Sequence, residues 1–143
     1  MTSKPDHLDE LRDALAQVSF TLMAVLTEVA GEHDLSLTQL RVLGILRDRE
    51  PTMAELATFT GLERSTISGL IDRAAHRGLV AKIADPRDGR SVRVTLTESA
   101  AELAREIAAA VGDRITPLTG TLSSAEQKRL TALLTKALNR SDP

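Results

Sequence analysis

The sequence predicts a mainly α-helical protein that carries one small β-hairpin. Along most of the 143 residues, apolar side chains recur every three or four positions, which is the spacing of one face of a helix. Only residues 80–96 change to an alternation of apolar and polar side chains, which is typical of strands. We therefore expect four helices, a hairpin and two further helices, in a single domain spanning residues 1–143.

The first predicted helix covers residues 6–32. Its apolar residues step alternately by three and four positions, so they form one seam that is close to a coiled-coil repeat. The seam consists of Leu8, Leu11, Leu15, Val18, Leu22, Val25 and Val29. A seam of this length predicts that the helix packs against a partner.

Capping residues mark the beginnings of the next helices. Ser36 and Gln39 are spaced as a capping box, in which the serine hydroxyl accepts a hydrogen bond from the third amide while the glutamine side chain reaches back. Thr52 and Glu55 have the same spacing. Pro51 ends the helix between the two boxes, because proline lacks the amide that a continuing helix needs.

The helices on either side of Gly61 have the spacing of a helix-turn-helix unit. Ala57 lies four positions before this glycine, and Ile67 and Leu70 lie six and nine positions after it. A small residue lets the helices approach, glycine permits a left-handed turn, and the two apolar residues pack the second helix onto the first. The second helix of such a unit enters the major groove of DNA.

The stretch after this helix predicts a hairpin with a charged tip. Val80–Ala84 and Val92–Leu96 are the expected strands, and Asp-Pro-Arg-Asp-Gly-Arg lies between them. A hairpin directly after a recognition helix makes a winged helix, and arginine at the tip of a wing suits the narrow, negative minor groove. Residues 35–97 are therefore the predicted DNA-binding core.

Residues 98–140 are expected to form two further helices. Thr97 caps the first, which Pro117 and Gly120 are expected to break, and Ser123 begins a third capping box with Glu126. The apolar faces of the last helix and of residues 6–32 are too large for isolated arms. We therefore expect segments 6–32 and 98–140 to form a dimer interface about a two-fold axis.

Charge is unevenly distributed along the chain. The net charge is −2, yet residues 64–93 hold seven basic and three acidic residues, against eleven basic and seventeen acidic in the remainder. A basic surface on an acidic body is typical of a polyanion-binding protein, although charge alone also fits a solvated face. With no Trp, no Tyr and two Phe, the chain has few base-stacking side chains, which favours duplex over single-stranded nucleic acid.

Several classes of protein are disfavoured. There is no cysteine, so disulfides, thiolate metal sites and cysteine nucleophiles are excluded. The longest uncharged stretch, Ala14 to Thr27, is shorter than the roughly 20 residues of a membrane span, and no signal peptide precedes it, so we expect a cytoplasmic protein. His7 and Glu10 lack a third metal ligand, and no nucleophile elbow or phosphate loop is present. Neither an enzyme nor a bound metal or cofactor is expected.

These motifs resemble the MarR family of bacterial regulators. The resemblance is carried by LSLTQLRVL (35–43), MAELATFTGLERSTISGLIDRAAHRGLV (53–80) and DPRDGRSVRVTLT (85–97), of which the last is similar to the family's wing signature. It implies a homodimer on a pseudo-palindromic duplex operator and, often, a small effector. The implied function is a sequence-specific transcription regulator, usually a repressor released by a lipophilic or phenolic ligand.

The resemblance also implies roles for individual residues. The expected base-reading residues are Arg64, Ser65, Thr66 and Ser68; the backbone contacts are Arg73 and Arg77; the wing residues for the minor groove are Arg87, Asp88 and Arg90. Asp88 is expected to pair with the guanidinium of Arg90. The role of Asp72 stays open, because an acid on the groove helix repels phosphate unless a cation or a cytosine amine pairs with it.

The input of such a regulator is less clear from the sequence. Phe20, Met23 and Arg41 are candidates to line a pocket for a small aromatic or lipophilic anion, with ordinary core packing as the alternative. Cysteine and tryptophan, used by the peroxide-sensing and urate-responsive branches, are absent, and a zinc-ligand cluster is hardly offered. The competing function is a winged helix that binds protein instead of DNA, which predicts no salt-dependent duplex binding.

Overall fold

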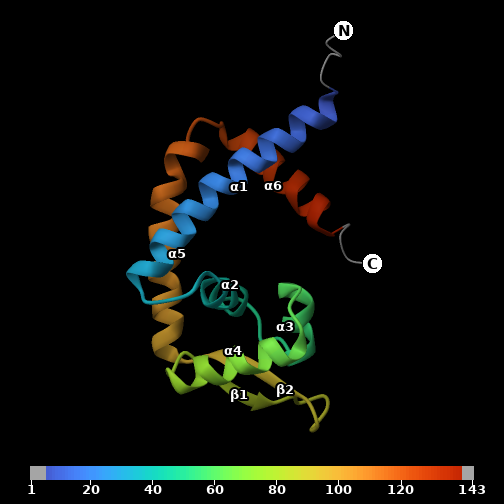
Figure 1. The fold of residues 1–143 in the computed structure, drawn as a ribbon, viewed down its shortest axis with the longest axis vertical. Helices are drawn as coiled ribbons and strands as arrows, with labels where there is room; N and C mark the ends of the chain where they lie inside the picture. The colour runs from blue at the N-terminus through green and yellow to red at the C-terminus, as the bar shows by residue number, and fades with distance from the viewer. Residues whose placement is uncertain (1–5, 140–143) are drawn as a thin grey trace. The chain divides into compact units, whose positions relative to one another are not determined.

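The computed structural model of the chain describes residues 6–139, which hold six helices and one hairpin in the expected order (Figure 1). These residues form two compact units that divide after Val111. The predicted domain 1–143 and dimerisation segment 98–140 both extend beyond the described residues. The elements are α1 (His7–Glu32), α2 (Leu37–Leu46), α3 (Met53–Thr60), α4 (Arg64–His76), β1 (Val80–Ala84), β2 (Val92–Leu96), α5 (Glu98–Thr119) and α6 (Ser124–Asn139).

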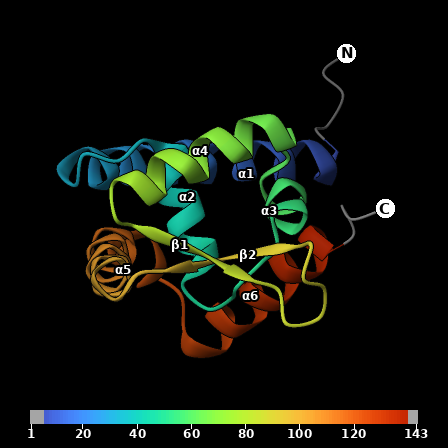
Figure 2. The same cartoon turned by 90° about the horizontal axis from the view of Figure 1, so that it is seen from below.

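The core of the first unit lies between α2, α3, α4, the hairpin and the first half of α5. Leu56, Ile67, Ile71 and Val94 are completely buried there. On α4 the buried positions follow the spacing i, i+3, i+4 and i+7, as the sequence predicts, so one face of the helix is fixed and the other is left to solvent. In the view of Figure 2, α4 lies along one side of the hairpin.

Two helix beginnings differ in how fully they are capped. At α2, Gln39 N donates to Ser36 Oγ (3.1 Å) and Ser36 N donates to Gln39 Oε1 (2.9 Å), so the predicted box is confirmed. At α3, Glu55 N donates to the Thr52 hydroxyl (3.2 Å), but the glutamate carboxylate accepts from that same hydroxyl. The prediction of a complete second capping box is therefore wrong, because the Glu55 side chain does not accept a hydrogen bond from the Thr52 amide. Thr52 instead forms an antiparallel bridge with Arg93 of β2.

The hairpin has the predicted strands and an antiparallel register that runs from Val80 opposite Leu96 to Ala84 opposite Val92. Val94 is buried in the middle of β2, whereas Val92 is 37% exposed. Val92 lies at the last pair of the ladder before the tip, where its partner is a small alanine. The expected burial of alternate side chains of β2 is therefore incomplete near the tip of the hairpin.

The end of α5 corrects an expectation from the sequence. The helix continues through Pro117 and ends at Thr119, so proline does not break it. Proline lies in the last turn, where few hydrogen bonds follow it. Gly120 is the residue that ends the helix: its amide donates to the Thr116 carbonyl at 2.7 Å, and a Cβ on Gly120 would lie 2.8 Å from that oxygen.

The second unit contains α6, whose beginning matches the sequence. Ser123 N donates to Glu126 Oε1 (2.9 Å) and Glu126 N donates to Ser123 Oγ (3.2 Å), so this capping box is confirmed. Hydrogen bonds to the carboxyl group, first from the Ser123 amide and then from the Ser123 side chain, hold the pKa of Glu126 below its ordinary value. The helix buries none of its residues, and its large apolar side chains Leu130, Leu133, Leu134 and Leu138 are all exposed.

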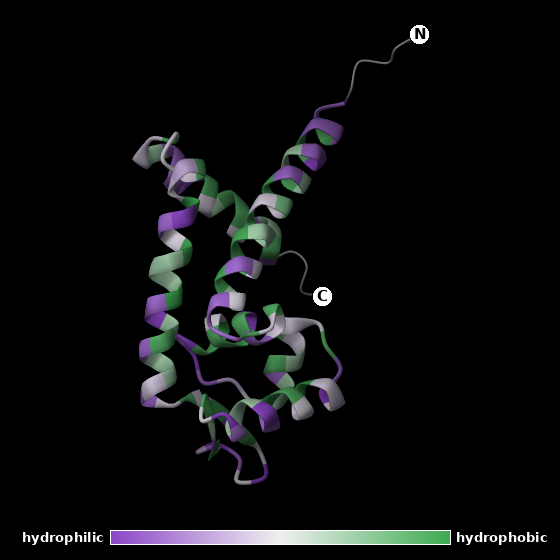
Figure 3. Cartoon of the chain, turned by 60° about the vertical axis from the view of Figure 1, so that its left-hand side comes forward, coloured by the Kyte–Doolittle hydropathy of each residue, from purple (hydrophilic) through white to green (hydrophobic). Residues whose placement is uncertain are grey.

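Most of α1 is also exposed, although it is rich in apolar residues (Figure 3). Leu8, Leu11 and Leu15 are 60%, 55% and 46% exposed, and only Val29 and Ala30 near the end of the helix are buried. By length and composition α1 could cross a membrane, which the length of its uncharged stretch did not suggest. Its apolar seam occupies one stripe, which is the pattern of a helix that packs against protein.

Candidate nucleic-acid interface

The turn between α3 and α4 fixes the direction of α4. Gly61 adopts φ 69 and its amide donates to the Ala57 carbonyl at 2.9 Å, as expected for a left-handed residue that ends a helix. The buried Thr60 hydroxyl donates to the Leu56 carbonyl (2.7 Å) and accepts from the Leu62 amide (3.3 Å). The turn is therefore held by both backbone geometry and a buried hydroxyl.

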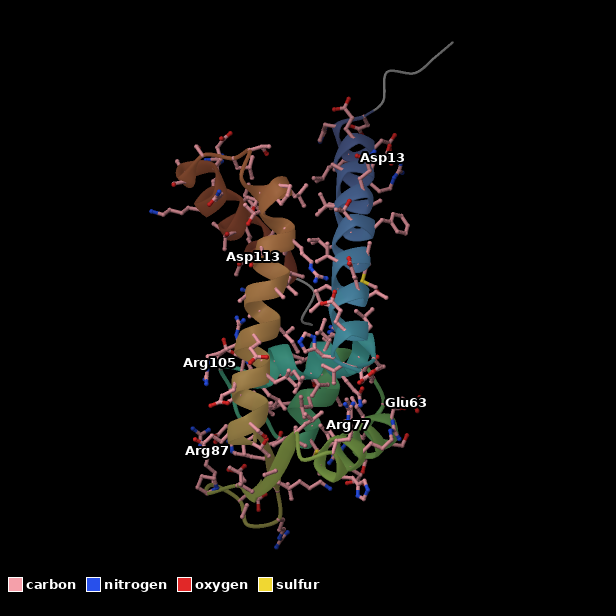
Figure 4. All side chains as sticks on the ribbon, turned by 90° about the vertical axis from the view of Figure 1, so that its left-hand side faces the viewer. Asp13, Glu63, Arg77, Arg87, Arg105 and Asp113 are labelled. Carbon is pink, nitrogen blue, oxygen red and sulfur yellow. The ribbon has the colours of Figure 1, made fainter. Side chains whose placement is uncertain are left out.

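The solvent face of α4 carries the four residues expected to read bases. Arg64, Ser65, Thr66 and Ser68 are all exposed, whereas Ile67 between them is completely buried. In Figure 4, Glu63 at the start of α4 and Arg87 of the wing both lie in the lower part of the view, on opposite sides of it. The exposed polar residues of α4 and the exposed arginines of the wing belong to the two elements that a winged helix uses in duplex recognition.

Arg73 lies back along α4 toward this polar face. A Cβ on Gly69 would lie 3.2 Å from a terminal nitrogen of Arg73, so the glycine leaves the space that this guanidinium occupies. In the sequence, the signal for this contact is a glycine one helical turn before an arginine. The arrangement brings a cation alongside the residues expected to read bases.

Asp72 forms an ion pair with Lys82 of β1. The sequence does not define the role of this aspartate. In the structure its partner is a lysine of the wing, and neither Arg73 nor a DNA base is needed to pair with it. The pair joins the groove helix to the first strand of the wing. It also neutralises an acid that would otherwise repel phosphate.

A second ion pair anchors the base of the wing. Arg93 Nε donates to Asp85 Oδ1 at 3.0 Å, the Arg87 amide donates to the same oxygen at 3.0 Å, and Arg93 Nη1 donates to the Glu50 carbonyl at 2.7 Å. Asp85 is only 8% exposed. These hydrogen bonds lower the pKa of Asp85, with the Arg87 amide as the first cause and the Arg93 side chain as the second.

At the tip of the wing, Arg87 and Arg90 are exposed. Asp88 Oδ1 accepts from the Arg90 backbone amide at 3.0 Å. The expected pair between Asp88 and the Arg90 guanidinium is therefore not what the structure contains. Aspartate readily bonds the backbone two residues ahead in a turn, so Asp88 shapes the loop while the guanidinium stays available.

Comparison with known proteins now places this arrangement in a family. A sequence model of a protein family, described as MarR family, matches residues 33–91. The HTH-type transcriptional repressor NicR of Pseudomonas putida is 32% identical over 117 residues, which cover 81% of this chain and 74% of NicR. The chain belongs to the MarR family.

Solved MarR-family structures share the fold. A variant of E. coli MarR complexed with operator DNA is 27% identical, has a TM-score of 0.69 and is matched over 92% of this chain and 96% of that one. NadR in complex with 4-hydroxyphenylacetate has a TM-score of 0.81 at 22% identity, with 96% of each chain matched, which shows the fold alone. This MarR-family chain is a winged helix-turn-helix DNA-binding transcription regulator.

Arg77, expected to contact the DNA backbone, has a partner within the protein. Its Nη1 donates to the Asp34 carbonyl at 2.9 Å, across 43 positions of sequence. Asp34 lies in the loop between α1 and α2. The structure thus gives this arginine a structural contact at the end of α4 that the sequence did not suggest.

The three residues expected to line an effector pocket lie in different surroundings. Phe20 is 78% exposed and Met23 is 45% exposed, so neither packs in the core of the chain. Arg41 donates from Nη1 to the Thr60 carbonyl (3.2 Å) and from Nη2 to the Phe59 carbonyl (2.9 Å). The last carbonyls of a helix lack intrahelical partners, so Arg41 caps α3 and supports the helix-turn-helix turn.

Metal ligands are not gathered in the described part of the chain. Within residues 6–139, no group of three or more His, Asp or Glu side chains is placed to hold an ion. The imidazole that the sequence raised as a candidate ligand, His7, contacts Asp6 at 2.8 Å on the surface.

The wing anchor gives a pH-dependent prediction. Because the pKa of Asp85 is lowered in the folded state, its contribution to stability is present above the unfolded value near 3.9 and is lost as pH falls through the folded value. We expect Asp85→Asn to unfold at lower denaturant than the wild type at pH 7, and the difference to shrink below about pH 4. Urea unfolding at pH 7, 5 and 3 measures this, with Asp88→Asn as the matched control. A difference that is constant with pH would contradict the ionic role of Asp85.

Proposed function

We propose that this regulator acts as a homodimer that represses transcription by occupying a pseudo-palindromic site in duplex DNA. The observation that carries the proposal is the exposed apolar seam of α1, whose three N-terminal leucines are each about half exposed or more. Burial of such a surface stabilises a complex by about 25 cal/mol per Å² of apolar area. A two-fold axis through this interface presents two α4 helices to one face of the duplex, about 34–36 Å apart.

Each protomer then contributes three kinds of contact. The exposed face of α4, comprising Arg64, Ser65, Thr66 and Ser68, reads base edges in the major groove. Arg73 binds the phosphate backbone nearby, and Arg87 and Arg90 of the wing enter or flank the minor groove. A protein with this task works in the cytoplasm, where chromosomal DNA is accessible.

The assembly is tested by light scattering at micromolar concentration. We expect a mass twice the 15.4 kDa of one chain. The same preparation is then used to select binding sequences from a random duplex library. Recovered sequences are expected to contain two inverted half-sites. A monomer in solution, or selected sequences without dyad symmetry, would refute the proposed dimeric regulator.

We further propose that a small aromatic or lipophilic anion relieves repression. The ligand of the NadR complex, 4-hydroxyphenylacetate, is of this chemical class. Such a ligand lowers DNA affinity only if it binds more tightly to a conformation in which the two α4 helices are wrongly spaced. Phe20 and Met23 are exposed apolar side chains on α1 suited to contact it, whereas Arg41 is already occupied by α3 carbonyls.

A release assay separates this input from a redox input. We expect millimolar aromatic carboxylates to release the protein from a selected operator, and Met23→Ala to weaken that response without weakening DNA binding. Low peroxide should leave binding unchanged, because the chain has no cysteine and methionine oxidises slowly. Fluorescence anisotropy of labelled operator measures both effects. Reversible release by low peroxide, with no effect of any aromatic acid, would contradict the proposed input.

A further inference from the structure

The C-terminal ends of α1 and α4 are built alike. At the end of α1, Asp34 adopts φ 54 and is the single non-glycine residue with positive φ among the described residues. Its amide donates to the Gly31 carbonyl (3.3 Å), and the Leu35 amide donates to the Ala30 carbonyl (2.9 Å). These two bonds define a Schellman motif, in which the left-handed position is usually glycine.

The end of α4 repeats this motif. Gly78 adopts φ 75, its amide donates to the Ala75 carbonyl (3.0 Å), and the Leu79 amide donates to the Ala74 carbonyl (2.9 Å). In both motifs the leucine that follows is buried. Each helix therefore ends at a well-defined residue. A contact between the two C-terminal ends can hold α4 in a fixed orientation relative to α1.

Arg77 joins the two motifs. It is the C-cap residue of α4, and its guanidinium donates to the carbonyl of Asp34, the left-handed residue that ends α1. A cation is favoured at a helix C-terminus, where unpaired carbonyls carry partial negative charge. Here one guanidinium lies at the ends of two helices.

The start of α5 meets the same corner. The Thr97 hydroxyl donates to the Gly78 carbonyl at 2.7 Å, and the Thr97 amide donates to the Leu79 carbonyl at 3.1 Å. Thr97 Oγ1 also accepts from the Ala100 amide at 3.2 Å and so caps α5. The C-terminal end of α4 is thus hydrogen-bonded to the end of α1 on one side and to the beginning of α5 on the other.

We propose that Arg77 is a positioning residue that sets the angle of the recognition helix relative to α1, and thereby the half-site spacing that the dimer accepts. The inference rests on the proposed function, because spacing has meaning only for a dimer on a two-part site. The base-reading residues lie at the opposite end of α4, so a change of angle at Arg77 displaces them without altering their chemistry. In a dimer the displacement occurs twice, in opposite directions along the duplex.

The proposal separates Arg77 from Arg73, which lies four positions earlier on α4. A phosphate contact contributes equally at every spacing, and its loss reduces the salt dependence by about one phosphate. A positioning contact has the opposite signature. Its loss leaves the affinity for one half-site and the salt dependence unchanged, but lessens the preference for the correct spacing.

The experiment uses the full chain and duplexes selected from a random library by the wild-type protein. Affinities are measured for the selected operator, for versions with one base pair inserted or removed at its centre, and for a single half-site. One inserted base pair shifts the second half-site by about 3.4 Å and turns it by about 35°. The variants are Arg77→Gln, Arg77→Lys and Thr97→Val, with Arg73→Gln as the control that removes an equal charge from the same helix.

We expect the wild type to lose at least about tenfold in affinity on insertion of one base pair, and Arg77→Gln to reduce that ratio to about threefold or less. Thr97→Val should reduce the ratio likewise from the α5 side, and Arg77→Lys should restore part of it. Arg73→Gln should weaken binding at every spacing and keep the ratio. If Arg77→Gln is unfolded at the assay temperature by circular dichroism, Thr97→Val and Arg77→Lys decide the question.

Two results would overturn the inference. If Arg77→Gln weakens binding equally at all spacings and lowers the salt slope by about one, Arg77 is a phosphate contact. If it changes neither affinity nor spacing preference, the hydrogen bond to Asp34 has no positioning role. Failure of the wild type to select any duplex is a separate result, because it refutes the proposed function and the inference falls with it.

Discussion

Replacement of Leu15 by glutamate in the α1 seam is expected to abolish tight operator binding. Leu15 is 46% exposed in the single chain and lies in the middle of the seam. In a dimer, Leu15→Glu places a charge from each protomer in an apolar interface, which costs far more than the lost leucine contact. The resulting monomer binds only one half-site, so the loss of bivalency weakens operator binding by about 10²-fold or more.

The matched control is Gln17→Glu, which adds the same charge two residues further along α1, outside the seam. It should leave both the dimer and the operator affinity unchanged. Sedimentation equilibrium and anisotropy on one preparation measure the two properties together. If Leu15→Glu remained dimeric with full affinity, the seam would not be the dimer interface.

The second large effect is expected at the wing. Arg90 is exposed at its tip, and the local acid Asp88 is engaged by the Arg90 backbone amide, so the guanidinium is available to DNA. Arg90→Ala should weaken binding to all duplexes by about tenfold at moderate salt, because a minor-groove cation contributes charge and shape recognition. Lys128→Ala on α6, which also removes one exposed positive charge, is the control and should have little effect.

Substitutions on α4 should behave differently from Arg90→Ala. Loss of a good base contact at Ser65, Thr66 or Ser68 costs about 1–3 kcal/mol at one base pair and changes which base is preferred there. Binding measured against a panel of single-base operator variants distinguishes the two patterns. Undiminished affinity of Arg90→Ala, or an altered base preference in that variant, would contradict the role given to the wing.

The parts of the fold that the sequence predicts well are governed by local chemistry. The capping boxes at Ser36 and Ser123 depend on side chains three residues apart, and both form as expected. The strands of the hairpin follow from alternation and from the turn formers between them. Gly61 adopts a left-handed conformation because the tight turn after α3 requires it. For each of these features, the determining residues are neighbours in the sequence.

The parts that the sequence does not predict depend on contacts between distant residues. Arg77 meets Asp34 across 43 positions, Arg41 meets Thr60 across 19, and Lys82 meets Asp72 across ten. No periodicity or spacing shows which surface cation will be drawn to which helix end. For this reason the sequence suggests an effector contact for Arg41 and a phosphate contact for Arg77. In the structure, both guanidinium groups instead donate hydrogen bonds to backbone carbonyls at the C-terminal ends of helices.

Three local expectations also fail. The Thr52–Glu55 box lacks its reciprocal hydrogen bond, and Asp88 bonds the Arg90 backbone amide in place of the guanidinium. The third failure, at Pro117, has a positional reason. The sequence predicts a break in α5 at Pro117, since proline removes a hydrogen bond from a helix interior. It lies three residues before Gly120, in the last turn, where that loss has little effect on the rest of the helix. Proline does disfavour a continuing helix, but its position close to the C-terminal end of α5 allows the helix to continue past it to Thr119.

The most direct test of a dimeric, sequence-specific DNA-binding regulator is the stoichiometry and salt dependence of the wild-type protein on its selected operator. We predict saturation at two chains per duplex. We also predict an affinity that falls steeply between about 50 and 200 mM salt, since each phosphate contact contributes about one to the logarithmic slope. A duplex without the selected half-sites should bind at least about 10³-fold more weakly. Saturation at one chain per duplex, or binding that is indifferent to both salt and sequence, would contradict this function.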